Sequence, residues 1–342
     1  MSSVQGDSWL TSQPAAPHGG ASSCRLDLSA SLNPLGAHPA ALAAARRCRL
    51  DRYPEPDASS LAAAAAARHG VEAADVVPFP GAAAAVWLCA LAFAGRSSRA
   101  LVLAPGFGEH ERCLRIAGCS VTSLWVWPQS DIVSAKLESA LSTGADVCVL
   151  SNPSAPSGRA VPASALRALC AAYPATLFLV DEAFAAFGPP GTTLLDDPLR
   201  HNTVVIRSLT KELGLPGLRM GYAVTSRERA ERLRGLLPAW ALSGSAIAAG
   251  VAGMVDLDHV LRGAQVARST LAAVRGGLQG AGIVTFPSDA NYLVASAPGL
   301  VESLAARGVG VRDCASFGLP GHLRIAAPAP RDLPAVLASI RG

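Results

Sequence analysis

The sequence predicts an α/β protein, with a mostly parallel sheet in a large domain and a smaller α+β domain toward the C-terminus. From Val76 to Val224, short β-rich runs alternate with helical ones, which is typical of a parallel sheet covered by helices on both faces. After Ser226 this alternation gives way to a long helical tract followed by short strands, which indicates a second domain. A length of 342 residues is sufficient for two cores.

The composition narrows the class of protein. Half of the residues are hydrophobic and 16% are charged, which argues against a disordered or fibrous chain. The net charge is only +4 and no block of like charge occurs, so no nucleic-acid partner is expected. No secretory signal or membrane-spanning run is present, so we expect a cytoplasmic protein without membrane contact. The eight cysteines form no C-x-x-C pair, which favours buried thiols over disulfides or a zinc site.

The first two-thirds of the chain contain an arm and the alternating elements. Residues 1–23 are rich in Ser, Gly and Pro and are expected to form a flexible arm. Apolar, β-rich runs predict strands at Val76–Phe79, Ala100–Leu103, Val121–Val126, Asp146–Leu150, Thr176–Asp181, Thr203–Arg207 and Arg219–Val224. The runs between them predict helices at Ala82–Ala94, Glu109–Ala117, Ile132–Leu141 and Pro162–Ala172.

The last third has a different pattern. A helical tract from Arg227 to Gln279 is expected to break near Pro238 and Gly244. Short strands are predicted at Ile283–Phe286, Tyr292–Ala295, Gly310–Arg312 and His322–Ala326, and helices at Leu300–Arg307 and Leu333–Ile340. Residues 1–50 are expected to form an arm and part of the small domain, 51–235 the large domain, and 236–342 the small domain.

The stretch from Ser208 to Tyr222 is the most informative in the chain. Lys211 follows the apolar run Val204–Ile206, with a serine hydroxyl three residues before it and Arg219 eight residues after it. Such a lysine can condense with an aldehyde, while Ser208 and Arg219 supply hydrogen bonds and charge to a phosphate. The alternative is a surface loop whose lysine has no chemical role.

Two further elements support a cofactor site. Asp181 ends an apolar strand, where ligands of open α/β sheets collect, and its carboxylate could pair with a protonated pyridine nitrogen. The alternatives are a solvated strand end or a metal ligand, although no Walker-type glycine loop accompanies it. At Gly81, Ala82 and Ala83 a strand meets the start of a helix, where free N–H groups and small side chains suit a phosphate.

Taken in order, these elements resemble the fold-type-I pyridoxal-phosphate (PLP) enzymes, in the branch of histidinol-phosphate aminotransferase and threonine-phosphate decarboxylase. The resemblance runs from His18 to about Ala327 and is most specific in the Lys211 and Asp181 motifs. It implies aminotransferase fold type I, with PLP bound in the large domain and no metal. Lys211 would bind the cofactor as a Schiff base, and Asp181 would face the ring nitrogen.

The resemblance also implies further cofactor contacts. Arg52-Tyr53-Pro54 resembles the segment whose tyrosine reaches the cofactor phosphate of the neighbouring subunit, which implies a homodimer with shared active sites. Phe107 lies in a loop that resembles the one whose aromatic ring stacks on the pyridine. Asn152 opens a segment that resembles the family's N-P-x-N-P-x-G and is expected among the cofactor contacts.

Substrate contacts are implied near both ends of the chain. His18-Gly19 and the segment around Asn33 resemble the opening of the decarboxylase more than that of the aminotransferase. Arg312 and Arg324 lie in segments that resemble those gripping the acidic end of the substrate. A guanidinium suits this task because it binds a carboxylate through two parallel hydrogen bonds. The alternative for either arginine is a surface ion pair.

Three positions depart from the family pattern. Ala155 replaces an asparagine, and Phe184 a frequent tyrosine, that donate to the phenolic oxygen of the cofactor. Losing two such hydrogen bonds, each worth about 1.5–3 kcal/mol, is expected to raise the pKa of the Schiff-base proton. Ser31 replaces an asparagine of the N-terminal segment, which is expected to alter substrate contacts.

The reaction depends on which substrate bond stands perpendicular to the cofactor ring. Our first expectation is decarboxylation of an amino acid phosphate, L-threonine O-3-phosphate, to (R)-1-amino-2-propanol phosphate, as in cobalamin biosynthesis. The alternatives are transamination of histidinol phosphate and a reaction of specialised metabolism on the same scaffold. A ligand-sensing regulator is a further alternative, disfavoured because no DNA-binding module is expected before His18.

Overall fold

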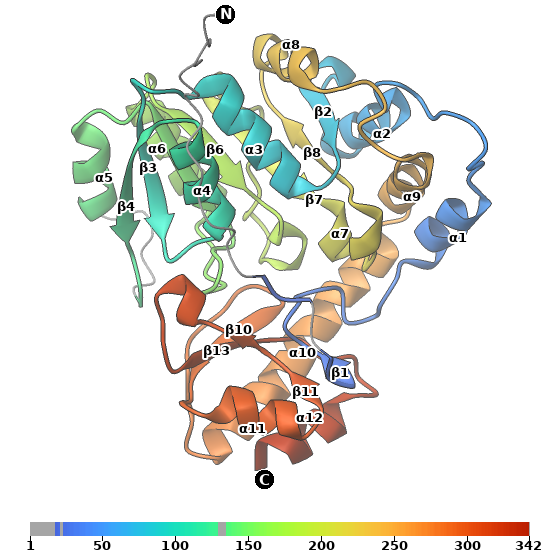
Figure 1. Ribbon diagram of the computed structural model, residues 1–342, viewed down its shortest axis with the longest axis vertical. Helices are drawn as coiled ribbons and strands as arrows, with labels where there is room; N and C mark the ends of the chain where they lie inside the picture. Colours follow the sequence, from blue (N-terminus) through green and yellow to red (C-terminus); the bar gives the residue numbers. More distant parts are fainter. Residues whose placement is uncertain (1–17, 21–22, 129–134, 342) are drawn as a thin grey trace, which may run out of the picture.

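A seven-stranded sheet forms the centre of the large domain (Figure 1). The computed structural model describes residues 18–20, 23–128 and 135–341. The strands lie in the order β2-β8-β7-β6-β5-β3-β4, and β8 is antiparallel to both of its neighbours while the other pairs are parallel. The strands are β2 (Val76–Phe79), β3 (Arg99–Ala104), β4 (Ser120–Trp125), β5 (Val147–Ser151), β6 (Leu177–Asp181), β7 (Thr203–Ser208) and β8 (Gly221–Val224). The predicted mostly parallel sheet is confirmed.

The central strands are apolar on both faces because helices cover both. In β5, Val147 and Val149 pack into one apolar cluster, while Cys148 and Leu150 pack into another on the opposite face. Helices α3, α4 and α8 cover the first face, and α2, α6 and α9 the second. The helices of the large-domain region predicted from sequence are α3 (Ala82–Phe93), α4 (Gly108–Ile116), α5 (Ala135–Ser142), α6 (Ala163–Ala172) and α8 (Arg227–Leu236). The predicted start of α5, at Ile132, lies outside the described residues, as does most of the predicted arm.

Two helices near the N-terminus were not predicted, α1 (Pro39–Arg47) and α2 (Ser59–His69). Both are rich in alanine, which has a high helix propensity but occurs on buried and exposed faces alike: in α2, Ala65 and Ala66 are buried whereas Ala63 and Ala67 are exposed. Both pack against α9 (Gly244–Val255). The approach of α2 to α9 is close, since a Cβ placed on Gly250 would lie 2.6 Å from a methyl carbon of Leu61.

The small domain contains a four-stranded antiparallel sheet and a two-stranded parallel one (Figure 1). The predicted strand Gly310–Arg312 is wrong as one element, because the chain passes from one sheet to the other at Val311. The elements are β1 (Leu26–Asp27), α10 (Asp258–Gly280), β9 (Val284–Thr285), β10 (Tyr292–Ser296), α11 (Leu300–Ala306), β11 (Val309–Gly310), β12 (Arg312–Asp313), β13 (His322–Ala326) and α12 (Leu333–Arg341).

The apolar clusters suggest where one domain ends. Ala246 and Ile247 of α9 belong to the same cluster as Leu61 of the large domain. In α10, Val260 also belongs to this cluster, whereas Leu271 packs with the strands of the small domain. The sequence-based boundary at residue 236 separates α9 from the core on which it packs. We propose instead that the small domain begins within α10.

No single helix in the described part of the chain is long and apolar enough to cross a bilayer. Helices α9 and α10 are so only when taken together, and they are bent by 78° at their junction. The described residues contain no group of three or more His, Cys, Asp or Glu side chains that could hold a metal ion. All eight cysteines are free thiols and six are buried, as their apolar surroundings predict.

Candidate active site

A cavity of about 500 Å³ lies at the carboxyl ends of β5, β6 and β7, and residues of both domains and of the N-terminal segment line it. Parallel strands end at the same edge of a sheet, so side chains far apart in sequence meet there. The residues predicted from sequence that line this cavity are His18, Gly19, Ala82, Ala83, Phe107, Asp181, Ser208, Lys211, Arg219, Arg312 and Arg324. Most of the predicted site is therefore brought together in one place.

Lys211 lies in α7 (Leu209–Glu212), a single helical turn that follows β7. The N-terminal segment anchors this turn, because the backbone N–H of Asn33 donates to the Lys211 carbonyl at 3.0 Å and its side-chain amide donates to the Glu212 carbonyl at 2.9 Å. Asn33 was predicted to contact the substrate. It is buried and does not line the cavity, so we correct this prediction: Asn33 holds the turn that carries Lys211.

The Lys211 amine has an environment that favours its neutral form. Burial, and then the nearby guanidinium groups of Arg324 and Arg219, lower its pKa to about 8, while Asp181 acts in the opposite direction. A neutral amine is the nucleophilic form of lysine, so the surroundings prepare Lys211 to attack a carbonyl carbon.

The Asp181 carboxylate is buried, and hydrogen bonds fix its position. Its Oδ1 accepts a hydrogen bond from the Ala183 N–H at 3.0 Å, and its Oδ2 lies 3.0 Å from Nε2 of His110. His110 was missed by the sequence reasoning, although it stands three residues after Phe107 on the first turn of α4. That spacing could have identified it, because residues three apart on a helix share a face.

The N-terminus of α3 has the features of an anion-binding site. Its first N–H groups, including those of Ala82 and Ala83, have no intrahelical partner, and the helix dipole adds positive charge. Gly81 does not line the cavity but makes room for Arg219, since a Cβ placed on Gly81 would lie 2.5 Å from Nη2 of that arginine. Gly81 also has a φ of 91°, which few residues other than glycine adopt.

Arg324 is a buried cation without an anionic partner in the described part of the chain. Its residue is 9% exposed, and its Nη2 donates to the Ser29 carbonyl at 3.2 Å. Among the described residues, no carboxylate pairs with it and its Nε has no hydrogen-bond partner. The guanidinium carbon of Arg324 lies 4.8 Å from the centre of the Tyr292 ring. This cation–π contact helps to fix the orientation of the guanidinium group.

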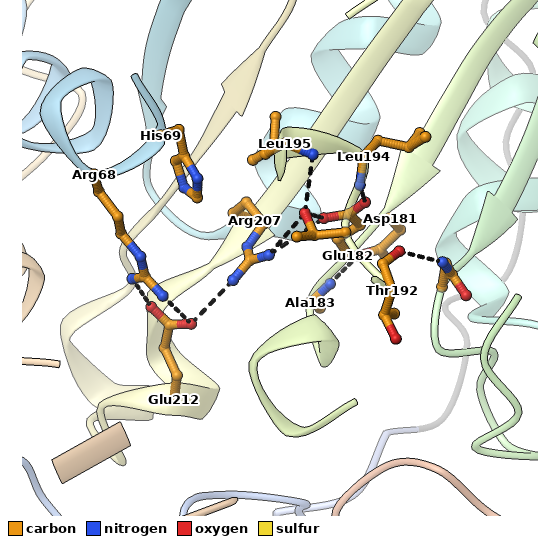
Figure 2. Close-up of polar contacts among 12 residues, drawn as sticks. Arg68, His69, Asp181, Glu182, Ala183, Thr192, Leu194, Leu195, Arg207 and Glu212 are labelled. Atoms are coloured by element: carbon orange, nitrogen blue, oxygen red, sulfur yellow. Dashed lines mark hydrogen bonds and ion pairs between the residues drawn. The ribbon is translucent and has the colours of Figure 1, made fainter. Parts of the chain in front are cut away.

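The other guanidinium groups differ in their partners. Buried Arg207 lies between two carboxylates, those of Glu182 and Glu212, as Figure 2 shows. Arg312 is partly exposed, donates to the Ser316 hydroxyl at 2.5 Å and stacks over Phe317. Arg324 is thus the buried arginine of the cavity that is positioned for a ligand.

Besides Gly81, two predicted cofactor contacts lie outside the cavity. Asn152 is buried and its amide donates to the carbonyls of Val161 and Thr192, while its oxygen accepts from the Val161 N–H. Both amide hydrogens are therefore used, and the prediction that Asn152 contacts the cofactor is corrected. Tyr53 is 82% exposed and packs against Trp240, with ring centres 4.9 Å apart.

The positions that depart from the expected pattern do line the cavity. Ala155 and Phe184 both face it, and neither side chain can donate a hydrogen bond there. Glu109, which the sequence reasoning did not select, is buried and also lines the cavity. Its Oε2 accepts from the Trp87 indole at 2.7 Å, and its Oε1 lies 3.5 Å from Nε2 of His18.

Comparisons with known proteins identify the family of the chain. The family model described as aminotransferase class I and II matches residues 25–340. Histidinol-phosphate aminotransferases from Symbiobacterium thermophilum and Roseobacter denitrificans are each 32% identical to the chain, covering 87% and 91% of it and 84% and 89% of their own lengths.

Among solved structures, histidinol-phosphate aminotransferase from Sinorhizobium meliloti in complex with pyridoxal-5'-phosphate has a TM-score of 0.84 at 19% identity, covering 93% of this chain and 90% of its own. L-threonine-O-3-phosphate decarboxylase from Porphyromonas gingivalis has a TM-score of 0.79 at 25% identity, covering 92% and 98%. Both have the predicted fold, which is thereby confirmed.

Proposed function

The chain belongs to the class I and II aminotransferases, a family of PLP-dependent enzymes, and from this we propose that it acts on a small amino acid carrying a phosphate ester. The observation that carries this proposal is Arg324, a buried guanidinium without an acidic partner in the described chain. Since a buried unpaired charge is costly, a substrate carboxylate would complete the site. Arg312, also in the cavity wall, supplies a second positive charge for an anionic substrate.

The residues of the cavity fit the cofactor. We propose that Lys211 holds its aldehyde, that Asp181 faces its ring nitrogen, and that Phe107 covers its ring. The N-terminus of α3, Ser208 and Arg219 would hold its phosphate, in the space that the small side chains of Ala82 and Ala83 leave. When bound, PLP draws the electron pair of a broken substrate bond into its ring. His110 would keep the Asp181 carboxylate in position for the ring nitrogen.

Our first candidate reaction is loss of carbon dioxide from L-threonine O-3-phosphate. His18 and Gly19 line the cavity, and the segment to which they belong resembles the decarboxylase branch. The decarboxylase from Porphyromonas gingivalis supports this choice, at 25% identity over nearly its whole chain. The second candidate is transamination of histidinol phosphate, which the aminotransferase relatives at 32% identity favour. Histidinol phosphate has no carboxylate, so in this reaction Arg324 would bind a carboxylate of the keto-acid acceptor.

Parallel assays of the two substrates decide between the reactions. We expect threonine phosphate to release carbon dioxide without any keto-acid acceptor. If product forms only from histidinol phosphate, and only with 2-oxoglutarate present, the enzyme is an aminotransferase. Turnover of unphosphorylated amino acids in preference to both esters would contradict the proposed substrate class.

We further propose a homodimer in which Tyr53 reaches the cofactor phosphate of the partner subunit. Tyr53 lies outside the cavity of its own chain, and its ring is almost fully exposed. Leu50 is 85% exposed and Trp240 49% exposed, so large apolar side chains are exposed beside it in the single chain. Burial of such side chains is a usual source of stability for a dimer.

The pKa of Lys211 predicts how cofactor capture depends on pH. At pH 8 an amine with a pKa of about 8 is half neutral, roughly two orders of magnitude more than an ordinary lysine. We expect the rate at which the cofactor-free enzyme captures PLP to rise with pH to a midpoint near 8, measured by absorbance after mixing. The variant Arg324→Gln should move this midpoint upward, because it removes a nearby positive charge. A midpoint near 10.5 in the wild type would contradict the proposed role of the burial and of the arginines.

A further inference from the structure

Two arginines of like charge lie directly opposite each other in the sheet of the small domain. Arg312 of β12 and Arg324 of β13 are register partners in an antiparallel pair, so their side chains leave the same face of the sheet, and both line the cavity. Like charges in such a pair repel each other. Burial lowers the pKa of Arg324, and the positive charge of Arg312 acts in the same direction. The pair is therefore unfavourable unless other groups offset the repulsion.

The ring of Phe317 lies beside both guanidinium groups. The guanidinium carbon of Arg312 lies 5.3 Å from the centre of this ring, and that of Arg324 lies 5.9 Å from it. Both distances are within the range of about 6 Å over which an aromatic face attracts a cation. Phe317 is half-buried and lines the same cavity. One ring thus attracts both cations and offsets part of the repulsion between them.

Backbone hydrogen bonds and the large domain fix the turn that carries this ring. The Phe317 N–H donates to the Cys314 carbonyl at 2.9 Å, and the Cys314 N–H donates to the His322 carbonyl of β13 at 3.0 Å. From the large domain, Trp125 packs closely against the turn, since a Cβ placed on Gly318 would lie 3.1 Å from a ring carbon of Trp125. Contacts within the protein therefore set the position of the ring.

The two arginines differ in how firmly they are held. Buried Arg324 donates to the Ser29 carbonyl and packs against a second ring, that of Tyr292. Arg312 is partly exposed and donates to the Ser316 hydroxyl at the other end of the same turn. An arginine that water can reach has many rotamers, so a fixed ring beside it limits the directions in which its charge can point. Phe317 consequently matters most for Arg312.

We propose that Phe317 is a positioning residue that holds the Arg312 guanidinium beside Arg324, so that both cations face one anionic group of the substrate. This inference rests on the proposed function, because it takes that group to be the anion that Arg324 binds. An anion bound by both guanidinium groups removes the repulsion between them. Affinity for the anion then depends on a ring that carries no charge itself.

The test is a double-mutant cycle on ligand binding. Dissociation constants for L-threonine O-3-phosphate are measured with PLP-loaded enzyme by the change in cofactor absorbance. In Phe317→Leu, which keeps an apolar side chain but loses the aromatic face, we expect binding to weaken roughly fivefold. Phe317→Tyr retains the ring and should bind within about twofold of the wild type. When Arg312→Met is already present, adding Phe317→Leu should change binding less than about twofold, because the ring acts through that arginine.

Phe286 provides a matched control. It is another half-buried ring of the small domain, but it packs against Trp127, with ring centres 4.6 Å apart, and does not line the cavity. Phe286→Leu should therefore leave the affinity for threonine phosphate unchanged. A loss of affinity in Phe286→Leu as large as that in Phe317→Leu would overturn the proposal, since any lost ring of the domain would then have the same effect.

Wild-type affinity in Phe317→Leu, or equal weakening by the leucine and tyrosine variants, would also overturn it. So would a full effect of Phe317→Leu in the Arg312→Met background, because the ring would then contact the ligand itself or support the fold. If the wild type does not bind threonine phosphate, the proposed first substrate fails instead. The same cycle is then measured with histidinol phosphate and with inorganic phosphate, and absence of the ring effect with both overturns the Phe317 proposal as well.

Discussion

Replacing Lys211 with alanine is expected to lower turnover by at least about three orders of magnitude and to abolish the absorbance of lysine-bound cofactor. We propose this amine as the nucleophile of the cavity, and its lowered pKa keeps much of it neutral near pH 8. In the described part of the chain no other lysine lines the cavity, so no second amine can replace it. The measurements are kcat with the substrate identified by the parallel assays and the absorbance spectrum after PLP is added.

The chain offers a matched control for this prediction. Its sequence contains two lysines, Lys136 and Lys211. Lys136 is exposed on α5 and its amine donates to the Trp125 carbonyl, away from the cavity wall. Lys136→Ala should therefore retain wild-type turnover and spectrum, and borohydride reduction of the wild type should attach the cofactor to the peptide that contains Lys211. Attachment at Lys136, or a coloured and active Lys211→Ala variant, would refute the assignment.

The sequence pointed to Asp181 and Lys211 because Asp181 ends, and Lys211 closely follows, a strand that is buried on both faces. Such strands are near-continuous apolar runs, so their ends are well defined, and the observed ends of β6 and β7 differ from the predicted ones by at most one residue. Parallel strands then bring both ends to one edge of the sheet without any knowledge of side-chain positions. The fold class and the centre of the site could be predicted for this reason.

Contacts that depend on side-chain direction could not be predicted in this way. Asn152 stands in the expected segment, but its amide bonds to backbone carbonyls that come from Val161 and the distant Thr192. His110 meets Asp181 across 71 residues of chain. Neither contact produces a periodic pattern in the sequence, because each depends on how separate helices, strands and loops pack against one another. The alanine-rich helices α1 and α2 were missed for a related reason, since alanine does not mark which face is buried.

A second large effect is expected when Arg207 is replaced by methionine, through a group of buried charges behind the cavity (Figure 2). Arg207 Nη1 lies 3.2 Å from Oε2 of Glu182, and its Nη2 lies 3.3 Å from Oε2 of Glu212. Arg68 also pairs with Glu212, at 2.5 Å. The two carboxylates and two guanidinium groups balance in charge and are largely withdrawn from water.

This group of buried charges is connected to the cavity through the polypeptide backbone. Glu182, Arg207 and Glu212 are each bonded in sequence to a cavity residue, namely Asp181, Ser208 and Lys211. Arg207 and Ser208 are successive residues of β7, so their side chains point to opposite faces and Arg207 lies on the side away from the cavity. Glu182 follows the end of β6 and Glu212 lies on α7, and both pair with Arg207. Glu182 is tied further, since its Oε1 accepts from the Leu194 N–H at 2.7 Å.

Arg207→Met leaves Glu182 without its guanidinium partner and Glu212 with only Arg68. Removing one member of a buried charge group costs about 3–5 kcal/mol, because the remaining charges are uncompensated in a medium of low polarity. We expect a loss of this size in the free energy of unfolding, measured by urea denaturation of the PLP-free enzyme. Binding of PLP should weaken as well, because the backbone that carries Asp181 and Ser208 loses its support.

A surface ion pair provides the comparison that separates burial from charge alone. Arg49 pairs with Asp51 at 2.6 Å, but both side chains are more than 60% exposed. Water solvates these charges whether or not they meet, so Arg49→Met should leave the urea midpoint unchanged. If Arg207→Met were as harmless as Arg49→Met, the buried charges would not support the site. If both variants were equally damaging, the loss of an arginine itself, rather than its burial between two acids, would be responsible.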